Sequence, residues 1–525
     1  MILDKYPRAD LHELNLDWIL KTVKHLQETV ENLNVDEIIR ELIEDGTIYD
    51  HFGGYFNRYY LTYQDMQNDT ELQNNMVVLC LGYKNPMDGG IAYFGVSDNV
   101  GTRSLACQNG LYAHLAIEPK MEIVPFLALH SDDMGDAIND AQLAGVHQIF
   151  VRADLNCDID TEINLSYDLE VSPETTFTLN QPIKMHNATL RGGSYVVGPN
   201  LVPQSMIQLR DGNNTVDRVD MLVNASGKIG IGCFDGKGTI TNSYLNGDNT
   251  GEFGIWGEQA PAEYTMDIRE CIIEQFYSNG LFTEARSCLV SGCTFRKNHV
   301  KTMPTGGGQL CLKGGNTQGY NEVMNCQIVE PGGSATSGIE LWLSGNAIIH
   351  GNYIENKGSQ LDAIAVQAGC FADIYDNTLH GDSTNGVALH LYGNYAKVNT
   401  HDNWYAQWPT NIKITDATQS GAVKEKRFTG DLLNITAAVK PIFDVEGSVS
   451  YKAHVTSGSS FDFKMYEDDI LTIIDMTTGE MRQVFATVAG NYLIDAAFTH
   501  ITLTAGSGQI NLAVDQDTDV YIYRS

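Results

Sequence analysis

The pattern of apolar residues near the start of the chain is that of a helix. Apolar side chains recur at alternating steps of three and four residues, which is the a/d spacing of a coiled coil. These positions are Leu16, Ile19, Val23, Leu26, Val30 and Leu33. We expect residues 1–46 to form a helical segment whose seam serves self-association. Because the seam covers fewer than three heptads, an amphipathic helix packed on its own domain is the alternative.

Beyond residue 46 the pattern changes to period two. Short alternating runs bounded by Asn, Asp and Gly predict strands, as in IAYFGVS from Ile91 and HQIFVRA from His147. Between them, SDDMGDAINDAQLAGV from Ser131 has the spacing of one helix, which we place near residues 133–144. We therefore expect a small β-rich connector module at 47–123, followed by a unit that begins with a capping helix.

A degenerate repeat runs from about Ser205 to Asp416. Each copy has a first strand-like segment, such as GIWGE from Gly254, and a second one that follows a turn, such as HGNYI from His350. A repeat of 20 to 50 residues predicts a solenoid, with one coil per copy. One aligned turn position holds three cysteines and then three asparagines: Cys271, Cys293, Cys326, Asn352, Asn377 and Asn403. We predict that these side chains stack as a buried ladder, which does not converge on a point as metal ligands must.

The repeat ends near Gly421. The remaining residues, 421–525, contain short alternating strands without the coil spacing, and all ten cysteines lie earlier, between Cys80 and Cys370. We expect a separate C-terminal β-sandwich or jelly-roll-like domain.

Composition narrows the classes of function. The chain has 525 residues, 43% of them hydrophobic, with 66 acidic against 33 basic side chains and a net charge of -33. The apolar content excludes global disorder, and the acidic excess argues against nucleic acid and anionic membranes as partners. No apolar run reaches the length of a membrane span, and the N-terminus lacks the pattern of a signal peptide. We expect synthesis in the cytosol without secretion, and cysteines that stay reduced.

Several segments resemble a known family. HGNYIEN from His350 and YDNTLHG from Tyr375 resemble coils of right-handed parallel β-helix proteins of the pectate-lyase superfamily. PFLALHSDDMGDAINDAQLAGVHQIFV from Pro125 resembles the capped start of that fold in bacteriophage tailspikes and appendages, although its acidic turn is degenerate. LHELNLDWILKTVKHL from Leu11 and NGLYAHLAIE from Asn109 resemble leading segments of phage appendage proteins. The fold expected is mainly β, with a right-handed parallel β-helix over residues 124–416.

The resemblance also implies a function. A tailspike of this kind is a homotrimer on the virion, joined to tail or collar proteins through its N-terminal segment. It binds, and often depolymerises, a bacterial cell-surface polysaccharide during adsorption, without a cofactor. A non-enzymatic receptor-binding or structural appendage is the alternative, and a bacterial surface adhesin is a weaker one.

Candidate chemistry lies on the outward side of the first strands. Alternate side chains of a strand point outward, and coils about 4.8 Å apart stack them into columns. Glycoside cleavage needs two carboxyl groups, and sugars stack on exposed aromatic rings. The candidate catalytic residues are Glu258, Glu284 and Glu340. The candidate glycan-binding residues are Trp256, Phe282, Gln309, Trp342, Gln367 and His390.

Other interpretations of this face stay open. The acids can be ordinary solvated residues of an acidic protein, and a neighbouring subunit can cover the rings. Acids on loops or near other strands are further candidates, namely Asp267, Asp362, Asp376 and Asp382. Because the net charge of -33 repels anionic polymers, the sequence slightly favours a neutral glycan.

Overall fold

A computed structural model describes residues 58–525. The positions within this range that it does not describe are 131, 152–155, 203, 258–263, 300–306, 314–320, 331–336, 343–345, 356–361, 368, 382–385, 393–396, 409, 416–421, 424–431, 436–441, 444–448, 465–469, 487–491, 495–496, 507–508 and 525. The predicted helical segment at 1–46, with its a/d seam, lies outside the described residues. Contacts divide the chain into two units, Met1–Leu155 and Asn156–Ser525.

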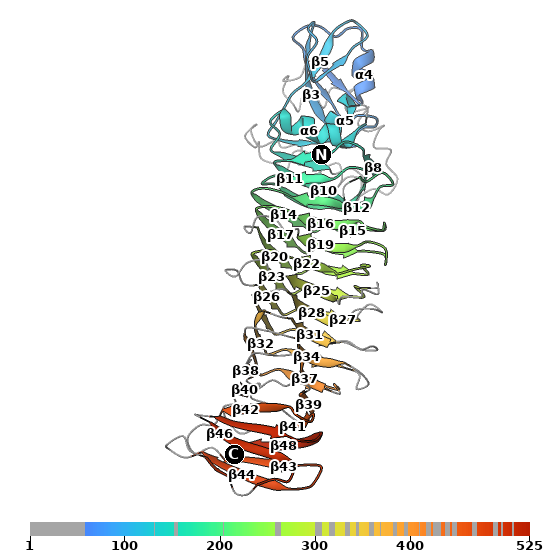
Figure 1. Ribbon diagram of the computed structural model, residues 1–525. Helices are drawn as coiled ribbons and strands as arrows, with labels where there is room; N and C mark the ends of the chain where they lie inside the picture. Colours follow the sequence, from blue (N-terminus) through green and yellow to red (C-terminus); the bar gives the residue numbers. More distant parts are fainter. Residues whose placement is uncertain are drawn as a thin grey trace, which may run out of the picture. The chain divides into compact units, whose positions relative to one another are not determined.

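The first unit contains a five-stranded sheet in the order β1-β2-β3-β5-β4 (Figure 1). Its strands are β1 (Arg58–Tyr60), β2 (Val77–Cys80), β3 (Ala92–Ser97), β4 (Ser104–Ala106) and β5 (Tyr112–Leu115). β1 and β2 are parallel, and the other neighbours are antiparallel. The short helix α4 (Tyr63–Asn68) begins with a capping box, in which the Thr62 hydroxyl and the Asp65 carboxylate each accept from the other's backbone N–H.

Two helices and a strand pair complete this unit. They are α5 (Val124–Leu129), α6 (Met134–Leu143), β6 (Lys120–Glu122) and β7 (Gln148–Val151). The Asp133 side chain caps α6 by accepting from the Asp136 N–H, and the helix buries Met134, Ala137, Ile138 and Ala141. α6 therefore lies within residues 133–144, where the apolar spacing places a helix.

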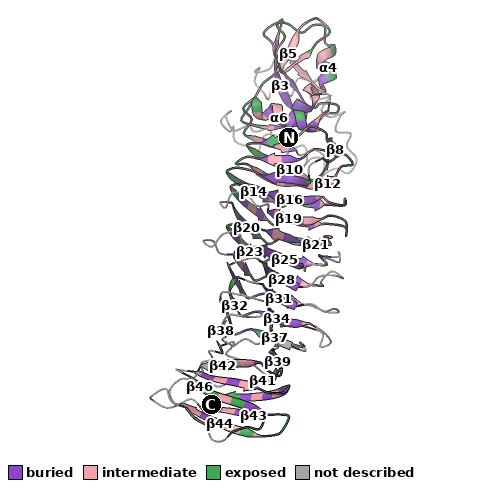
Figure 2. Ribbon diagram, viewed as in Figure 1, coloured by how far each residue is buried: buried purple, intermediate pink, exposed green. Residues whose placement is uncertain are grey.

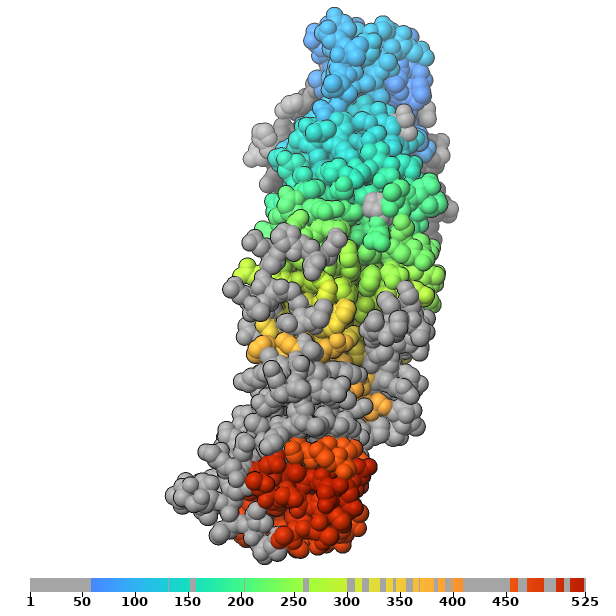
Figure 3. Space-filling model, viewed as in Figure 1, coloured from blue at the N-terminus to red at the C-terminus, as the bar shows by residue number. Residues whose placement is uncertain are grey.

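The second unit confirms the predicted parallel β-solenoid. In Figure 3 its colour bands follow one another in sequence order, as expected when each coil stacks on the one before. Sheet I consists of one strand per coil, each parallel to the next. Its strands are β9 (Ile163–Leu165), β11 (Ile183–Met185), β13 (Ser205–Leu209), β16 (Ile229–Cys233), β19 (Phe253–Gly257), β22 (Leu281–Thr283), β25 (Gly308–Lys313), β28 (Ser337–Trp342), β31 (Asp362–Val366), β34 (Val387–Tyr392) and β37 (Thr410–Thr415).

Sheet II contains two strands per coil over most of its length, joined by a tight turn. It begins with β8 (Asn156–Ile159), β10 (Asp168–Leu179) and β12 (Thr189–Val197). The strand pairs that follow are β14 (Asn213–Asp217) and β15 (Asp220–Leu222), β17 (Lys237–Thr241) and β18 (Tyr244–Asn246), β20 (Thr265–Arg269) and β21 (Ile272–Glu274), β23 (Ser287–Ser291) and β24 (Thr294–Arg296), β26 (Asn321–Met324) and β27 (Gln327–Val329), β29 (Asn346–His350) and β30 (Tyr353–Glu355), β32 (Phe371–Tyr375) and β33 (Thr378–His380), β35 (Lys397–His401) and β36 (Trp404–Ala406).

The turn between the paired strands explains the choice of residues there. In successive coils one residue takes a left-handed conformation, a position that Gly, Asn and Asp tolerate best. These residues are Arg218, Asn242, Glu270, Gly292, Asn325, Gly351, Asp376 and Asp402. The residue that follows each of them points into the coil, and the buried residues of Figure 2 line the strands on either side.

The predicted ladder is formed by these inward residues. The Asn377 Oδ1 accepts from the Asn352 backbone N–H at 3.1 Å, and the Asn377 Nδ2 donates to the Ile349 carbonyl at 2.8 Å. Asn403 repeats both bonds one coil on, to Asn377 and Ile374. Cys271, Cys293 and Cys326 occupy the same position in the preceding coils and are buried. Each ladder side chain therefore ties two successive coils together without exposing a polar group.

Parallel stacking continues past Gly421, where the sequence suggests a separate domain. β39 (Leu432–Ile435) pairs in parallel with β37 and with β41 (Val449–Val455). Antiparallel pairing begins at β41, which pairs with β48 (Thr518–Arg524). β48 also pairs with β43 (Ile470–Asp475), β43 with β44 (Met481–Ala486), and β44 with β45 (Tyr492–Ile494). A second sheet contains β38 (Ala422–Val423), β40 (Ile442–Phe443), β42 (Ser460–Lys464), β47 (Gln509–Val514) and β46 (Ile501–Gly506).

The cysteines provide a test of the ladder. Of the ten thiols only Cys157 is partly exposed, and the other nine are buried. Burial of Cys271, Cys293 and Cys326 keeps a reagent from reaching their thiols in the native protein. We expect a thiol reagent to modify Cys157 rapidly in the native protein and the remaining cysteines only after denaturation. Peptide mapping that shows rapid native labelling of the three ladder cysteines would contradict this arrangement.

Candidate functional site

Two columns of side chains run along the side of sheet I that faces away from the coil interior. Strand register places in column 1 the residues Gln208, Gly232, Trp256, Phe282, Cys311, Glu340, Ala365 and His390. Column 2 lies two residues later and contains Arg210, Phe234, Glu284, Lys313, Trp342 and Gln367. The residues between the columns, such as Leu341 and Val366, are fully buried.

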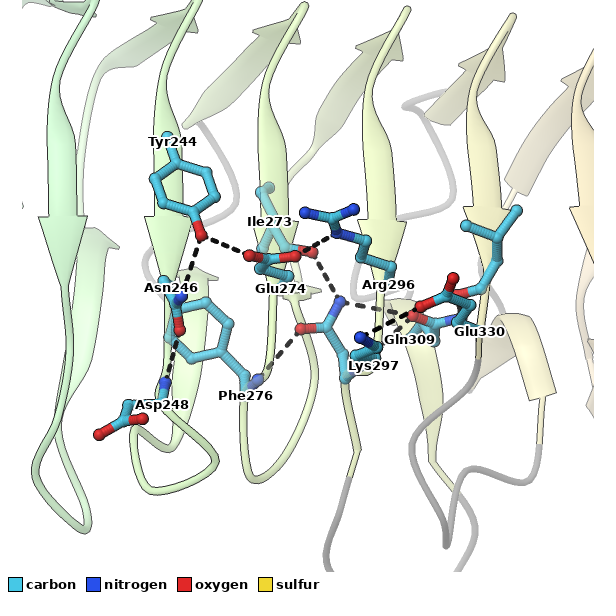
Figure 4. Close-up of polar contacts among 12 residues, drawn as sticks. Tyr244, Asn246, Asp248, Ile273, Glu274, Phe276, Arg296, Lys297, Gln309 and Glu330 are labelled. Carbon is cyan, nitrogen blue, oxygen red and sulfur yellow. Dashed lines mark hydrogen bonds and ion pairs between the residues drawn. The ribbon is translucent and has the colours of Figure 1, made fainter.

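This register corrects three of the predicted placements. If the first strands are aligned on the glycines that begin them, among them Gly307 and Gly386, then Cys311 and His390 fall in column 2 and Gln309 falls in column 1. The strand pairs instead place Cys311 and His390 in column 1, because their coils reach sheet I two residues later. Gln309 does not point outward and is fully buried. Its Nε2 donates to the Val329 carbonyl at 3.1 Å, and its Oε1 lies 3.5 Å from the Asn298 Nδ2 (Figure 4). Gln309 thus satisfies backbone and amide groups inside the coil.

A cluster of two carboxyl groups lies where β28, β31 and β34 meet. Glu340, Asp362 and His390 come from these three strands, and their exposed fractions are 5%, 6% and 5%. The His390 Nδ1 lies 2.7 Å from the Asp362 Oδ2, and the Gln367 Nε2 donates to the Glu340 Oε1. The structure therefore brings together three of the predicted residues with Asp362, which the sequence supports only as a secondary candidate. We call Glu340 and Asp362, with His390 and Gln367, the carboxyl cluster.

Electrostatics give Glu340 an unusual proton affinity. Burial, reinforced by the charge of Asp362, raises the pKa of Glu340 to about 7, against hydrogen bonds from Gln367 and the Gly308 backbone that lower it. A carboxyl that holds its proton near neutral pH can act as a general acid. The nearby Asp362 oxygen, bonded to an imidazole, supplies a second carboxyl group with a different environment.

A buried hydroxyl lies next to this cluster without a partner. Ser337 is the register neighbour of Asp362 on the preceding coil, and its Oγ has no hydrogen-bond partner among the described residues. A Cβ placed on Gly308 would meet both the Ser337 Oγ, at 3.0 Å, and the Glu340 Cβ, at 3.3 Å. Glycine at position 308 therefore permits the close packing of the backbone beside Glu340 and the unsatisfied Ser337 hydroxyl, because a Cβ would crowd both.

The other two predicted acids are not part of this cluster. Glu284 forms an ion pair with Lys313, and its side chain is only 8% exposed. The Lys313 ammonium also lies 5.4 Å from the centre of the Trp342 ring, so the three residues form one contact group along column 2. Glu258 lies outside the described residues.

Trp256 and Phe282 belong to a larger aromatic group. Phe234 and Phe253, which sequence reasoning missed, flank Trp256 with ring centroids 6.3 and 6.5 Å away. Phe253 also lies 5.9 Å from Phe282, and all four rings are partly exposed. We call these four residues the aromatic platform. The sequence could have identified Phe234, because this residue comes directly after the apolar strand β16, as Glu284 comes directly after β22.

Other acids are accounted for by structural roles. Asp267 binds Arg269 through both oxygens, at 2.6 and 2.8 Å, and Asp376 is one of the left-handed turn residues. Asp382 lies outside the described residues. The strongest rival to the carboxyl cluster is Glu274 on sheet II, whose carboxylate lies between the Tyr244 hydroxyl and Arg296 (Figure 4).

Glu274 is suited to a structural role. Burial alone would raise its pKa, but the bonds from Arg296 and Tyr244 lower the pKa of Glu274 below its usual value. A carboxylate that is ionised and held by two fixed donors has no proton to give and no free oxygen for a substrate. It ties neighbouring coils together on sheet II instead.

Two absences hold for the described part of the chain only. Within it, His, Cys, Asp and Glu side chains nowhere gather in groups of three or more that could hold a metal ion. Within the same residues, no helix combines the length and apolar character needed to cross a membrane.

No protein-family model and no curated protein sequence matches the chain. Among solved structures, its fold matches phage tailspike proteins with a β-solenoid. Tailspike protein 2 from Escherichia coli O157:H7 bacteriophage CAB120 has a TM-score of 0.45 at 10% identity, covering 92% of this chain and 76% of that one. The Dettilon tailspike protein has a TM-score of 0.45 at 12% identity, covering 77% and 94%. A tailspike of Acinetobacter baumannii bacteriophage Fri1, described as a capsular polysaccharide depolymerase, has a TM-score of 0.39 at 10% identity, covering 89% and 97%. At these values the function has to be argued from the side chains of this chain.

Proposed function

We propose that this protein is a virion tail appendage that binds a bacterial cell-surface polysaccharide and cleaves its glycosidic bonds at the carboxyl cluster. One observation carries the proposal: two buried carboxyl groups lie close together on sheet I, and one of them keeps its proton near neutral pH. Glycoside hydrolysis needs a protonated and an ionised carboxyl at the same time. The partly exposed rings of the aromatic platform on the same sheet are suited to stacking against sugars.

The residues of the cluster have separate tasks in this mechanism. Glu340 donates its proton to the oxygen of the leaving sugar, because its raised pKa keeps that proton available. Asp362 acts on the other side of the bond, as base for a water or as nucleophile. His390 holds the Asp362 carboxylate in position, and Gln367 orients the Glu340 carboxyl. Trp342 and the aromatic platform would bind sugar units along sheet I.

A binding-only appendage is the second candidate, and burial is the observation that favours it. Glu340 and Asp362 are about nineteen-twentieths covered, so little of either carboxyl group is accessible to a sugar. A protein that used only the partly exposed rings would bind the same polysaccharide without cleaving it. Fragment release from purified host polysaccharide distinguishes the two candidates.

We further propose a homotrimer that joins tail or collar proteins through the N-terminal segment. The support is the a/d seam in residues 1–46, which offers an apolar stripe for self-association. Multi-angle light scattering on the full chain is expected to give three times the mass of one chain, 57.8 kDa. A monomer at micromolar concentration would refute the trimer.

Two substitutions test the catalytic role. Glu340→Gln and Asp362→Asn keep the shape of each side chain but remove its ionisation, so we expect cleavage to fall by about 10²–10⁴-fold with binding to host cells retained. Glu284→Gln is the matched control, because Glu284 lies on the same sheet but pairs with Lys313, and it should retain most activity. Wild-type rates in both cluster variants would place any active site elsewhere.

The pH profile tests the proton on Glu340. The acid form of Glu340 is the active one, so activity should decline as the pH rises through the pKa of about 7. The hydrogen bond from Gln367 lowers this pKa, so Gln367→Leu should shift the alkaline limb to higher pH. A limb that stays in place in Gln367→Leu would assign it to another group.

A further inference from the structure

Arg210 is held in an unusual way at one end of the aromatic platform. Its guanidinium carbon lies 3.9 Å from the centre of the Phe234 ring, a stacked cation–π contact. One of its terminal nitrogens donates to the Gln208 Oε1 at 2.6 Å. The side chain is partly exposed, so the guanidinium is fixed in orientation and still reachable.

This guanidinium has no carboxylate partner among the described residues. Most other described arginines form ion pairs with acids: Arg58, Arg103, Arg191, Arg218, Arg269, Arg296 and Arg482. The adjacent Asp211 is paired with His186 instead, at 2.5 Å. In a chain with twice as many acidic as basic side chains, a fixed and unpaired arginine has the properties of a preformed anion receptor.

The position of Arg210 connects it to the rest of the candidate site. Phe234 meets Trp256 edge to face, with an interplanar angle of 80°, and the platform continues through Phe253 to Phe282. Arg210 directly follows β13, and Glu340 lies in β28. The order β13, β16, β19, β22, β25, β28 in sheet I puts five strand spacings between them, which is about 24 Å at the usual spacing. A glycan bound along sheet I would therefore reach both.

We propose that Arg210, Phe234 and Trp256 form a subsite for a sugar unit that carries an anionic group. The rings pack against the sugar, and the planar guanidinium donates two parallel hydrogen bonds to a carboxylate, sulfate or phosphate. This inference rests on the proposed function for the glycan nature of the ligand. It replaces the neutral glycan that the net charge favours, because at physiological salt charges act over about 8 Å and the local cation decides.

Binding of matched oligosaccharides tests the subsite. The full chain carrying Glu340→Gln, so that probes survive, is titrated calorimetrically with an oligogalacturonide, with its carboxyl-reduced neutral form and with a sulfated form of that neutral oligosaccharide. We expect at least one charged probe to bind about tenfold more tightly than the neutral one, and Arg210→Gln to abolish this preference. Whichever charged probe is preferred identifies a uronic acid or a substituent as the source of the charge.

A matched control and a second variant keep the result interpretable. Arg286→Gln removes the same charge from an exposed arginine that follows β22, and it should leave the preference intact. Phe234→Leu removes the ring that holds the guanidinium and should weaken the preference even if Arg210→Gln fails to fold. Equal binding of all three probes, or an unchanged preference in Arg210→Gln, would overturn the inference.

The outcome is separable from that of the proposed function. If the wild-type chain and Arg210→Gln cleave the host polysaccharide equally well and show no charge preference, the subsite is wrong and the cleavage site stands. If Glu340→Gln and Asp362→Asn still cleave while Arg210→Gln loses the preference, the cleavage site is wrong and the subsite stands.

Discussion

The hydrogen bonding between successive coils is the interaction on which the rest of the structure depends. Parallel pairing fixes the spacing of neighbouring strands at about 4.8 Å, and every side chain then has one neighbour above and one below. At the turns, however, some backbone N–H and C=O groups would lack hydrogen-bond partners inside the coil, because a tight turn interrupts the regular pairing between strands. Asn352, Asn377 and Asn403 solve the problem, because each donates to a carbonyl and accepts from a backbone N–H of the preceding coil. Where cysteine replaces asparagine, the small buried thiol preserves the stack at lower polarity.

The same spacing decides what chemistry the outer face can support. Side chains on adjacent coils are held close together, so two neighbouring acids repel unless one is protonated or a cation intervenes. Both solutions occur on sheet I. Lys313 neutralises Glu284, which leaves a stable contact group with Trp342. Glu340 instead lies near Asp362, and within the described part of the chain no lysine or arginine pairs with it, so the cost of burial appears as a raised pKa. The first arrangement stabilises the fold, and the second creates reactivity.

Much of the fold was predictable from the sequence, because the residue types that recur in the repeat have strong preferences for particular backbone conformations. Glycine, asparagine or aspartate at the left-handed turn, followed by a small inward residue, marks most of the coils even where the strands diverge, with Arg218 and Glu270 as the exceptions. The site was less predictable. Coil lengths vary, so alignment on Gly307 and Gly386 shifted two coils by two residues, turned Gln309 outward and separated His390 from Glu340. Asp362 lies in β31, three residues before Ala365, which is the position that aligns with Glu340, so the contact between the two acids is diagonal across the strands. The alternation of residues along a strand predicts which side chains share a face, but it does not predict a diagonal contact that involves the first residue of a strand.

Net charge and local charge lead to different expectations for the ligand, and their ranges explain why. The sum of -33 acts through solvent and is screened by salt over about 8 Å, so it affects the approach of a polymer more than its final contacts. At the surface of sheet I the relevant charges are few. Glu284 is compensated by Lys313, and the pKa of Glu340 is raised to about 7. Arg210 packs on Phe234 and has no acidic partner among the described residues. The described part of this face is therefore far less acidic than the whole protein. A strongly acidic chain can in this way present a surface on which an anionic group is bound rather than repelled, provided the acids along it are paired or protonated.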